Sequence, residues 1–214
     1  MLRHLKSVCN AEWQPVSRWA LYAWAAFYTV FVAYAASQHG EGLLIDNVNL
    51  VVHEGGHALF GWFGTFIGLC GGTALQLLVP VMLASYFFVQ RQAPGLAFCI
   101  FFFFENLLGV ATYMADARSM SLPLVTIGDP EFAIHDWNAI LGTLGLLNYD
   151  TMIASVIRLV GWTGMALTPV CLVIWSFRKS FATQSAHDFD TVSRMSAAGA
   201  PNLSRNCPES RKGH

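Results

Sequence analysis

The chain has 214 residues, of which 55% are hydrophobic and 12% are charged, and its formal net charge is -1. Soluble domains carry about 25% charged residues, so this composition, with a mean hydropathy of +0.47, argues against an ordinary soluble domain. It favours an integral, multi-pass membrane protein with lipids as its main surroundings. The near-neutral charge gives no reason to expect binding to nucleic acid.

The N-terminal part predicts a membrane anchor. Residues 1–18 are polar and carry Arg3, Lys6 and Arg18. Residues 19–36 are continuously apolar and long enough to cross a bilayer at 1.5 Å per residue. A cleaved signal peptide is the rival interpretation, but the long leading segment and the bulky aromatic residues argue against it.

The rest of the chain predicts a helical bundle, a membrane domain covering residues 19–177. Stretches of about span length follow one another in the order 19–36, 43–69, 73–89, 95–114 and 152–177. We place a turn between the second and third stretches at Gly71-Gly72. The sequence thus predicts an all-α membrane protein.

Residues 138–147 decide the number of spans. Ten residues of helix rise only about 15 Å, too little to cross a membrane. Five crossings would put the basic N-terminal segment and Arg178-Lys179 on opposite sides, which the positive-inside rule disfavours. A half-span at 138–147 would make a sixth crossing, so we expect five to six transmembrane helices. Residues 178–214 are polar and Ser-rich, and we expect a disordered tail.

The second predicted span carries the sequence His53-Glu54-Gly55-Gly56-His57, an H-E-x-x-H motif. On a helix, His53 and His57 lie one turn apart on the same face, where both imidazoles can bind one Zn²⁺. Glu54 is then placed to take a proton from a water molecule on the metal. Two histidines hydrogen-bonded within a protein core are the alternative. Ionisable groups are costly inside a membrane span, and this cost favours the functional interpretation.

A catalytic zinc site needs a third protein ligand. The candidates elsewhere in the chain are His39, Glu105, Asp116, His135 and Asp136. His135-Asp136-Trp137 is the best of these, because it offers a nitrogen and a carboxylate ligand together at the start of a predicted helix. The alternative is an aspartate helix cap beside an incidental histidine. Glu105 and Asn106, in the fourth span, are candidates for a supporting role.

The chain resembles the site-2-protease family of intramembrane zinc metalloproteases, especially its small, compact relatives. The resemblance rests on the motif in an apolar helix, the multi-span layout and the later aspartate. The resemblance covers about residues 43–177, but its specific part is the five-residue motif. It implies that His53, His57 and Asp136 bind zinc and that Glu54 is the catalytic base. In that family the aspartate usually stands in Asp-Gly within a span, whereas Asp136 stands in His-Asp-Trp, so His135 stays open as the third ligand or as its support.

We therefore expect an intramembrane zinc metallopeptidase that hydrolyses a peptide bond of a single-span membrane protein. The substrate helix would have to unwind locally, because its own hydrogen bonds shield the peptide bond. Two other functions remain open: a non-catalytic metal-binding subunit, scaffold or metal carrier of a larger complex, and a zinc hydrolase acting on another bond, such as a lipid amide. Glu54 favours catalysis, since a purely structural metal site does not need that carboxylate.

Overall fold

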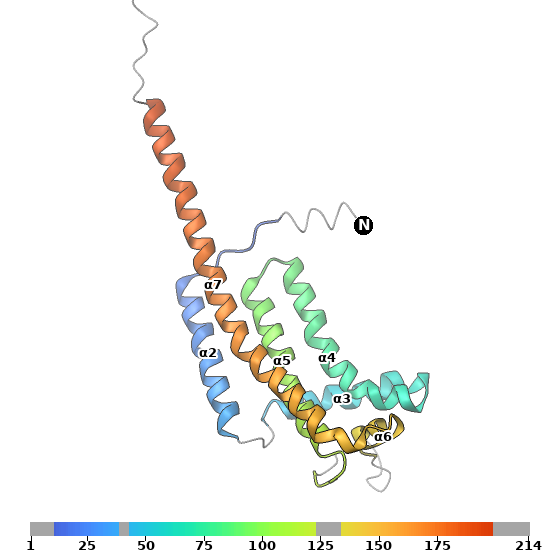
Figure 1. Ribbon diagram of the computed structural model, residues 1–214. Helices are drawn as coiled ribbons and strands as arrows, with labels where there is room; N and C mark the ends of the chain where they lie inside the picture. Colours follow the sequence, from blue (N-terminus) through green and yellow to red (C-terminus); the bar gives the residue numbers. More distant parts are fainter. Residues whose placement is uncertain (1–10, 39–42, 123–133, 199–214) are drawn as a thin grey trace, which may run out of the picture. The chain divides into compact units, whose positions relative to one another are not determined.

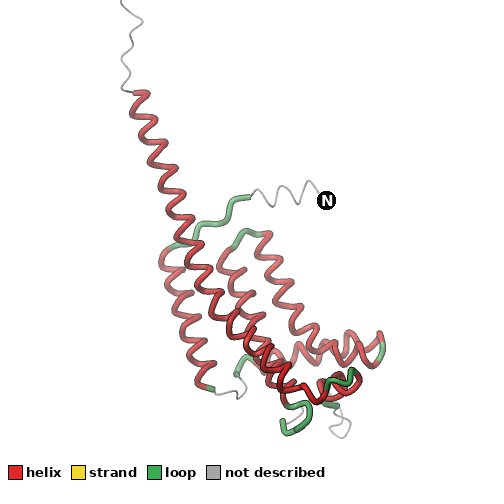
Figure 2. Tube along the Cα trace, viewed as in Figure 1, coloured by secondary structure: helices red, strands yellow, loops and turns green. Residues whose placement is uncertain are grey.

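The computed structural model describes residues 11–38, 43–122 and 134–198 of the chain. All regular structure in these residues is helical (Figure 2). The elements are α2 (Arg18–Ser37), α3 (Asp46–Phe60), η1 (Gly61–Phe63), α4 (Thr65–Val89), α5 (Ala93–Ala115), α6 (Asp136–Thr143), η3 (Leu147–Tyr149) and α7 (Asp150–Ala198). The predicted all-α fold is confirmed for the described residues.

Four segments in the described part of the chain are long and apolar enough to cross a membrane. They are Arg18–Ser37, Thr65–Val89, Ala93–Ala115 and Leu147–Ser180. Four candidate spans are compatible with a multi-pass membrane protein. Their number is lower than the five to six that the sequence predicts.

The missing span is the one predicted to carry the motif. Residues 43–69 do not form one helix: α3 ends at Phe60, and α4 begins after Gly64. Gly64 has φ 110° and ψ 162°, a conformation that is essentially restricted to glycine. With 15 residues, α3 rises only about 22 Å, which is less than the hydrocarbon core of a bilayer.

The predicted turn at Gly71-Gly72 is wrong, because both glycines lie inside α4. They serve close packing between helices instead. A Cβ on Gly56 would overlap the backbone of Gly71, and a Cβ on Gly71 would lie 2.6 Å from the Cβ of Phe60. The absence of side chains here lets α3 fold back on α4 as a tight helical hairpin.

Aromatic and small residues pack α2 and α7 against α5. Tyr28 of α2 is buried, and its ring lies 4.8 Å from that of Phe101. On the α7 side, a Cβ at Gly164 would overlap the ring of Phe104. At the C-terminal end of α5, a small apolar cluster joins α5, α6 and α7. Its buried members are Ala111, Met114, Ala117, Leu141 and Ala154. These contacts fix the end of α5 that lies beside α6.

Helices α3 and α6 lie at the same end of α4 and α5, the lower end in Figure 1. This is the end where α4 begins and α5 finishes. Neither α3 nor α6 is long enough to be a candidate span. The eight residues of α6 agree with the expectation that this segment is too short to cross a membrane.

The last helix is longer than expected. The final span was predicted to end at residue 177, but α7 continues to Ala198, so residues 178–198 are helical where a disordered tail was expected. Residues 199–214 lie outside the described residues. The chain divides into two compact units within α7, Met1–Val173 and Ile174–His214. In the second unit, Lys179 Nζ lies 5.6 Å from the centroid of the Trp175 ring.

Candidate metal centre

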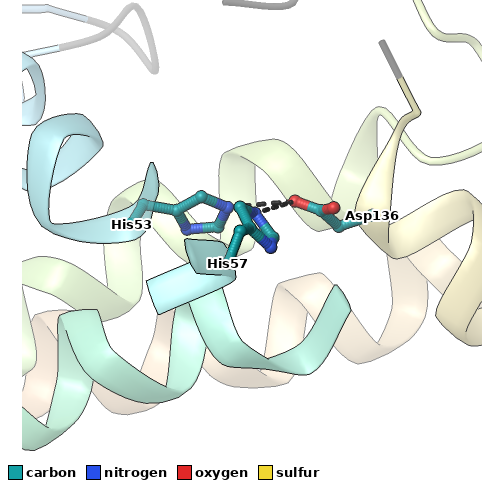
Figure 3. A group of neighbouring side chains, drawn as sticks. All are labelled: His53, His57 and Asp136. Carbon is teal, nitrogen blue, oxygen red and sulfur yellow. Dashed lines mark hydrogen bonds and ion pairs between the residues drawn. The ribbon is translucent and has the colours of Figure 1, made fainter. Parts of the chain in front are cut away.

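The two histidines of the motif meet Asp136 at the end of the bundle where α3 and α6 lie. Nε2 of His53 is 3.0 Å from Oδ2 of Asp136, and Nε2 of His57 is 3.2 Å from the same oxygen. Figure 3 shows both imidazoles turned toward this carboxylate. The three side chains form a group that could hold a metal ion, with one ligand atom from each lying within 4.8 Å of the others.

The spacing and the donor types fit a transition metal. Zinc bonds to imidazole nitrogen and carboxylate oxygen are about 2.0–2.1 Å long, and tetrahedral geometry then separates two ligand atoms by about 3.3 Å. The two nitrogen–oxygen distances, 3.0 and 3.2 Å, are close to that value. Two imidazoles and one carboxylate are also a known ligand set of catalytic zinc sites, in which a fourth position stays open.

Hydrogen bonds to the other ring nitrogens orient both imidazoles. Nδ1 of His53 lies 3.3 Å from Oε1 of Gln76, and Nδ1 of His57 lies 2.8 Å from the carbonyl oxygen of Gly68. A carbonyl oxygen can only accept, so each Nδ1 carries the proton and donates it. When the imidazoles are neutral, each Nε2 therefore keeps a free lone pair for a metal.

Close packing of α4 supports this arrangement. A Cβ on Gly72 would lie 2.5 Å from Nε2 of His53, so only glycine leaves room for the ring at this point of α4. Gln76 is one turn further along the same helix and is buried. The histidines thus come from α3, but their positions are set by α4.

Glu54 is partly buried and is not one of the three residues in the group. The negative charge of Glu54 nevertheless interacts with His57. The pKa of His57 is raised to about 9, first of all by the hydrogen bond to Asp136, while burial opposes the rise and the negative charge of Glu54 contributes to it. A carboxylate near the ligands but outside the ligand set is what a catalytic base requires.

His135, the other candidate for the third ligand, lies outside the group. Its Nδ1 accepts a hydrogen bond from the backbone N–H of Asn138 at 3.3 Å, so the side chain caps the N-terminus of α6. Its Nε2 lies 3.5 Å from Oδ2 of Asp116. The structure therefore reverses the expected alternative: the histidine is the cap, and Asp136 faces the motif.

Asp116 organises the chain that follows α5. One carboxylate oxygen accepts hydrogen bonds from the hydroxyl groups of Ser119 and Ser121, and the other accepts the backbone N–H of Leu122. Burial raises the pKa of Asp116, but these hydrogen bonds outweigh burial and hold the pKa well below its usual range. This carboxylate is therefore bound by its own loop and is not directed at the metal centre.

Glu105 and Asn106 are also outside the group. Both are fully buried in α5, and Oε2 of Glu105 accepts a hydrogen bond of 3.4 Å from Asn49 of α3. This bond links α5 to the stretch of α3 that precedes the motif. The supporting role expected for Glu105 stays a prediction. His39 lies outside the described residues.

Sequence reasoning missed the two groups that orient the imidazoles. A signal for Gln76 was present, because a lone amide in an apolar span is costly unless it has a partner. No signal in the residue type identifies Gly68, since its contribution is a backbone carbonyl. No protein-family model, curated protein or solved structure matches this chain.

Proposed function

We propose that this protein is a membrane-embedded zinc hydrolase that cleaves peptide bonds. The observation that carries the proposal is the meeting of His53, His57 and Asp136 around one point, with Glu54 beside them but outside the ligand set. The three ligands would hold the zinc ion through Nε2 of each histidine and a carboxylate oxygen of Asp136.

A zinc ion held there would supply a Lewis acid that acidifies a water molecule and polarises the carbonyl under attack. Glu54 accepts the proton that the attacking water loses as its oxygen bonds to the carbonyl carbon. When the carbon–nitrogen bond breaks, Glu54 donates that proton to the departing amine. The hydrogen bonds from His53 to Gln76 and from His57 to Gly68 keep the imidazoles fixed during these steps.

The position of the centre suggests which bonds it cuts. The carbonyl that holds His57 belongs to Gly68, in the first turn of α4, and α3 is too short to be a span. The contacts of the centre with α4 run from Gly68 to Gln76, in the first half of that helix. We therefore place the centre between the middle of the span and the end where α4 begins, where water is more accessible than at the bilayer midplane. We propose that the cleaved bond lies near the end of a substrate's transmembrane helix, where fewer helical hydrogen bonds must break.

The test uses the purified, zinc-loaded protein in detergent and a set of single-span peptides labelled at both ends. Glu54→Gln should keep zinc but lose about two to four powers of ten in cleavage rate, as loss of a general base does. Cut sites should cluster near one end of the apolar stretch. Equal cleavage by the wild type and Glu54→Gln would rule out the proposed chemistry. A zinc-loaded wild type that cleaves none of the peptides would favour the alternative function, a non-catalytic metal-binding scaffold.

A further inference from the structure

Tyr113, in the last turn of α5, makes two contacts with Asp136. Its hydroxyl oxygen accepts a hydrogen bond from the backbone N–H of Asp136 at 3.1 Å. The same hydroxyl donates to Oδ2 of that residue at 3.4 Å. One side chain thus contacts both the backbone and the carboxylate of the candidate third ligand.

The direction of these bonds follows from the donors available. The backbone N–H can only donate, so it uses a lone pair of the tyrosine oxygen and leaves the hydroxyl proton for another acceptor. The acceptor in reach is Oδ2 of Asp136, the oxygen that lies 3.0 Å from His53 and 3.2 Å from His57. The hydroxyl is therefore directed at the oxygen that faces both histidines.

The ring of Tyr113 lies between the motif and α6. Its centroid is 6.0 Å from that of His53, in an edge-to-face arrangement, and 4.3 Å from that of His135. Tyr113 is also only partly exposed. These contacts restrict the ring, and a restricted ring gives its hydroxyl a defined direction.

Asp136 needs such support because its own helix is short. With eight residues, α6 has few internal hydrogen bonds to hold its first turn in place. A second tie to the same part of the bundle comes from Asn138, whose side-chain amide donates to the carbonyl of Ala117 at 2.8 Å. That bond ties α6 to the end of α5 but does not touch the Asp136 carboxylate. Among the described residues outside the metal centre, the hydrogen bond to this carboxylate comes from Tyr113.

We propose that Tyr113 is a positioning residue that holds Asp136 with one carboxylate oxygen presented to the metal. The inference rests on the metal centre of the proposed function, not on peptide cleavage. Loss of an outer hydrogen bond to a metal ligand typically weakens metal binding about 10–100-fold. Because a freed carboxylate can turn and offer both oxygens, the coordination of the metal should change as well.

The test compares wild type, Tyr113→Phe and Tyr86→Phe as full-length proteins in detergent. Tyr113→Phe removes the hydroxyl and keeps the ring. Tyr86→Phe is the matched control, because Tyr86 is 57% exposed on α4. Zinc affinity is measured by competition with a chelator, and the visible absorption spectrum of the Co²⁺-substituted protein reports coordination geometry. A thermal melt of each metal-free protein controls for folding.

We expect Tyr113→Phe to bind zinc about 10–100-fold more weakly than wild type and to show an altered Co²⁺ spectrum, with Tyr86→Phe unchanged in both. Affinity and spectrum equal to wild type in Tyr113→Phe would overturn the positioning role while leaving the metal centre intact. An altered affinity with an unchanged spectrum would also contradict it, since a general loss of stability would explain that result. Absence of metal from the wild type would instead overturn the metal centre itself.

Discussion

Oδ2 of Asp136 lies 3.0 Å from Nε2 of His53, although 83 positions separate the two residues in the chain. The contact brings together a helix that is too short to span a membrane and the first residue of another short helix. Neither helix holds the contact alone, because α4 and α5 provide the groups that orient both side chains.

Gly72→Ala should displace His53 and abolish high-affinity metal binding. The added Cβ would lie 2.5 Å from Nε2 of His53, closer than real Cβ contacts, so the ring would have to move. Zinc content after purification measures this. Gly55→Ala is the matched control, because its Cβ would make only an ordinary contact of 3.9 Å with Leu75. Normal zinc content in Gly72→Ala would show that the close approach of α4 is not needed.

Gln76→Leu should weaken zinc binding about 10–100-fold, the usual cost of losing an outer partner of a ligating histidine. The change removes the acceptor of the His53 Nδ1 proton and so releases the ring orientation. Chelator competition measures the affinity. Ser85→Ala on the same helix is the control, since the Ser85 hydroxyl donates to the Val81 carbonyl of its own helix. If both variants bind zinc equally well, Gln76 does not orient the ligand.

The two neighbours at the start of α6 should differ in effect. Asp136→Ala should lose zinc as completely as His57→Ala, because its carboxylate faces both imidazoles. His135→Ala removes the α6 cap, which typically costs about 1 kcal/mol of stability, and should retain zinc. Zinc content and thermal melts separate the two effects. Loss of zinc in His135→Ala with retention in Asp136→Ala would reverse the assignment.

These experiments probe features that the sequence predicts to very different extents. The H-E-x-x-H spacing is local, so it is enough to place His53 and His57 on one helix face. Asp136 was identifiable as a candidate by its chemistry, but the choice between it and His135 needed the packing of α6 against α5. Both residue types ligate zinc, and only the fold decides which of them caps the helix.

The helix boundaries near the motif were not predictable from composition. Glycine serves both as a turn residue and as a small surface for close helix packing, and this chain has both uses within ten residues. Gly64 makes the turn, with its positive φ, while Gly71 packs against α3. The polar composition after residue 177 likewise favours disorder, yet α7 remains helical to Ala198.

Asp116 predicts a pH dependence of stability. Its pKa in the folded state is below the unfolded value of about 4, so the carboxylate stabilises the fold above that pH. This contribution is lost as the pH falls below about 4 toward the folded-state pKa. Asp116→Asn should lower stability by about 2 kcal/mol at pH 7, the scale of hydrogen bonds to a charged group.

Thermal melts between pH 7 and pH 3 in detergent measure the effect. The gap in melting temperature between wild type and Asp116→Asn should be full at pH 7 and should narrow below about pH 4. A gap that is constant over this range would show that the ionised carboxylate is not what holds the loop of Ser119, Ser121 and Leu122.

The central claim is that His53, His57 and Asp136 bind one zinc ion, and the metal content of the purified protein tests it most directly. We expect about one zinc per chain in the wild type, as one site with three protein ligands holds a single ion. Glu54→Gln should contain the same amount, since Glu54 is not a ligand, whereas His57→Ala should contain essentially none. A wild type with no more zinc than His57→Ala would contradict the account.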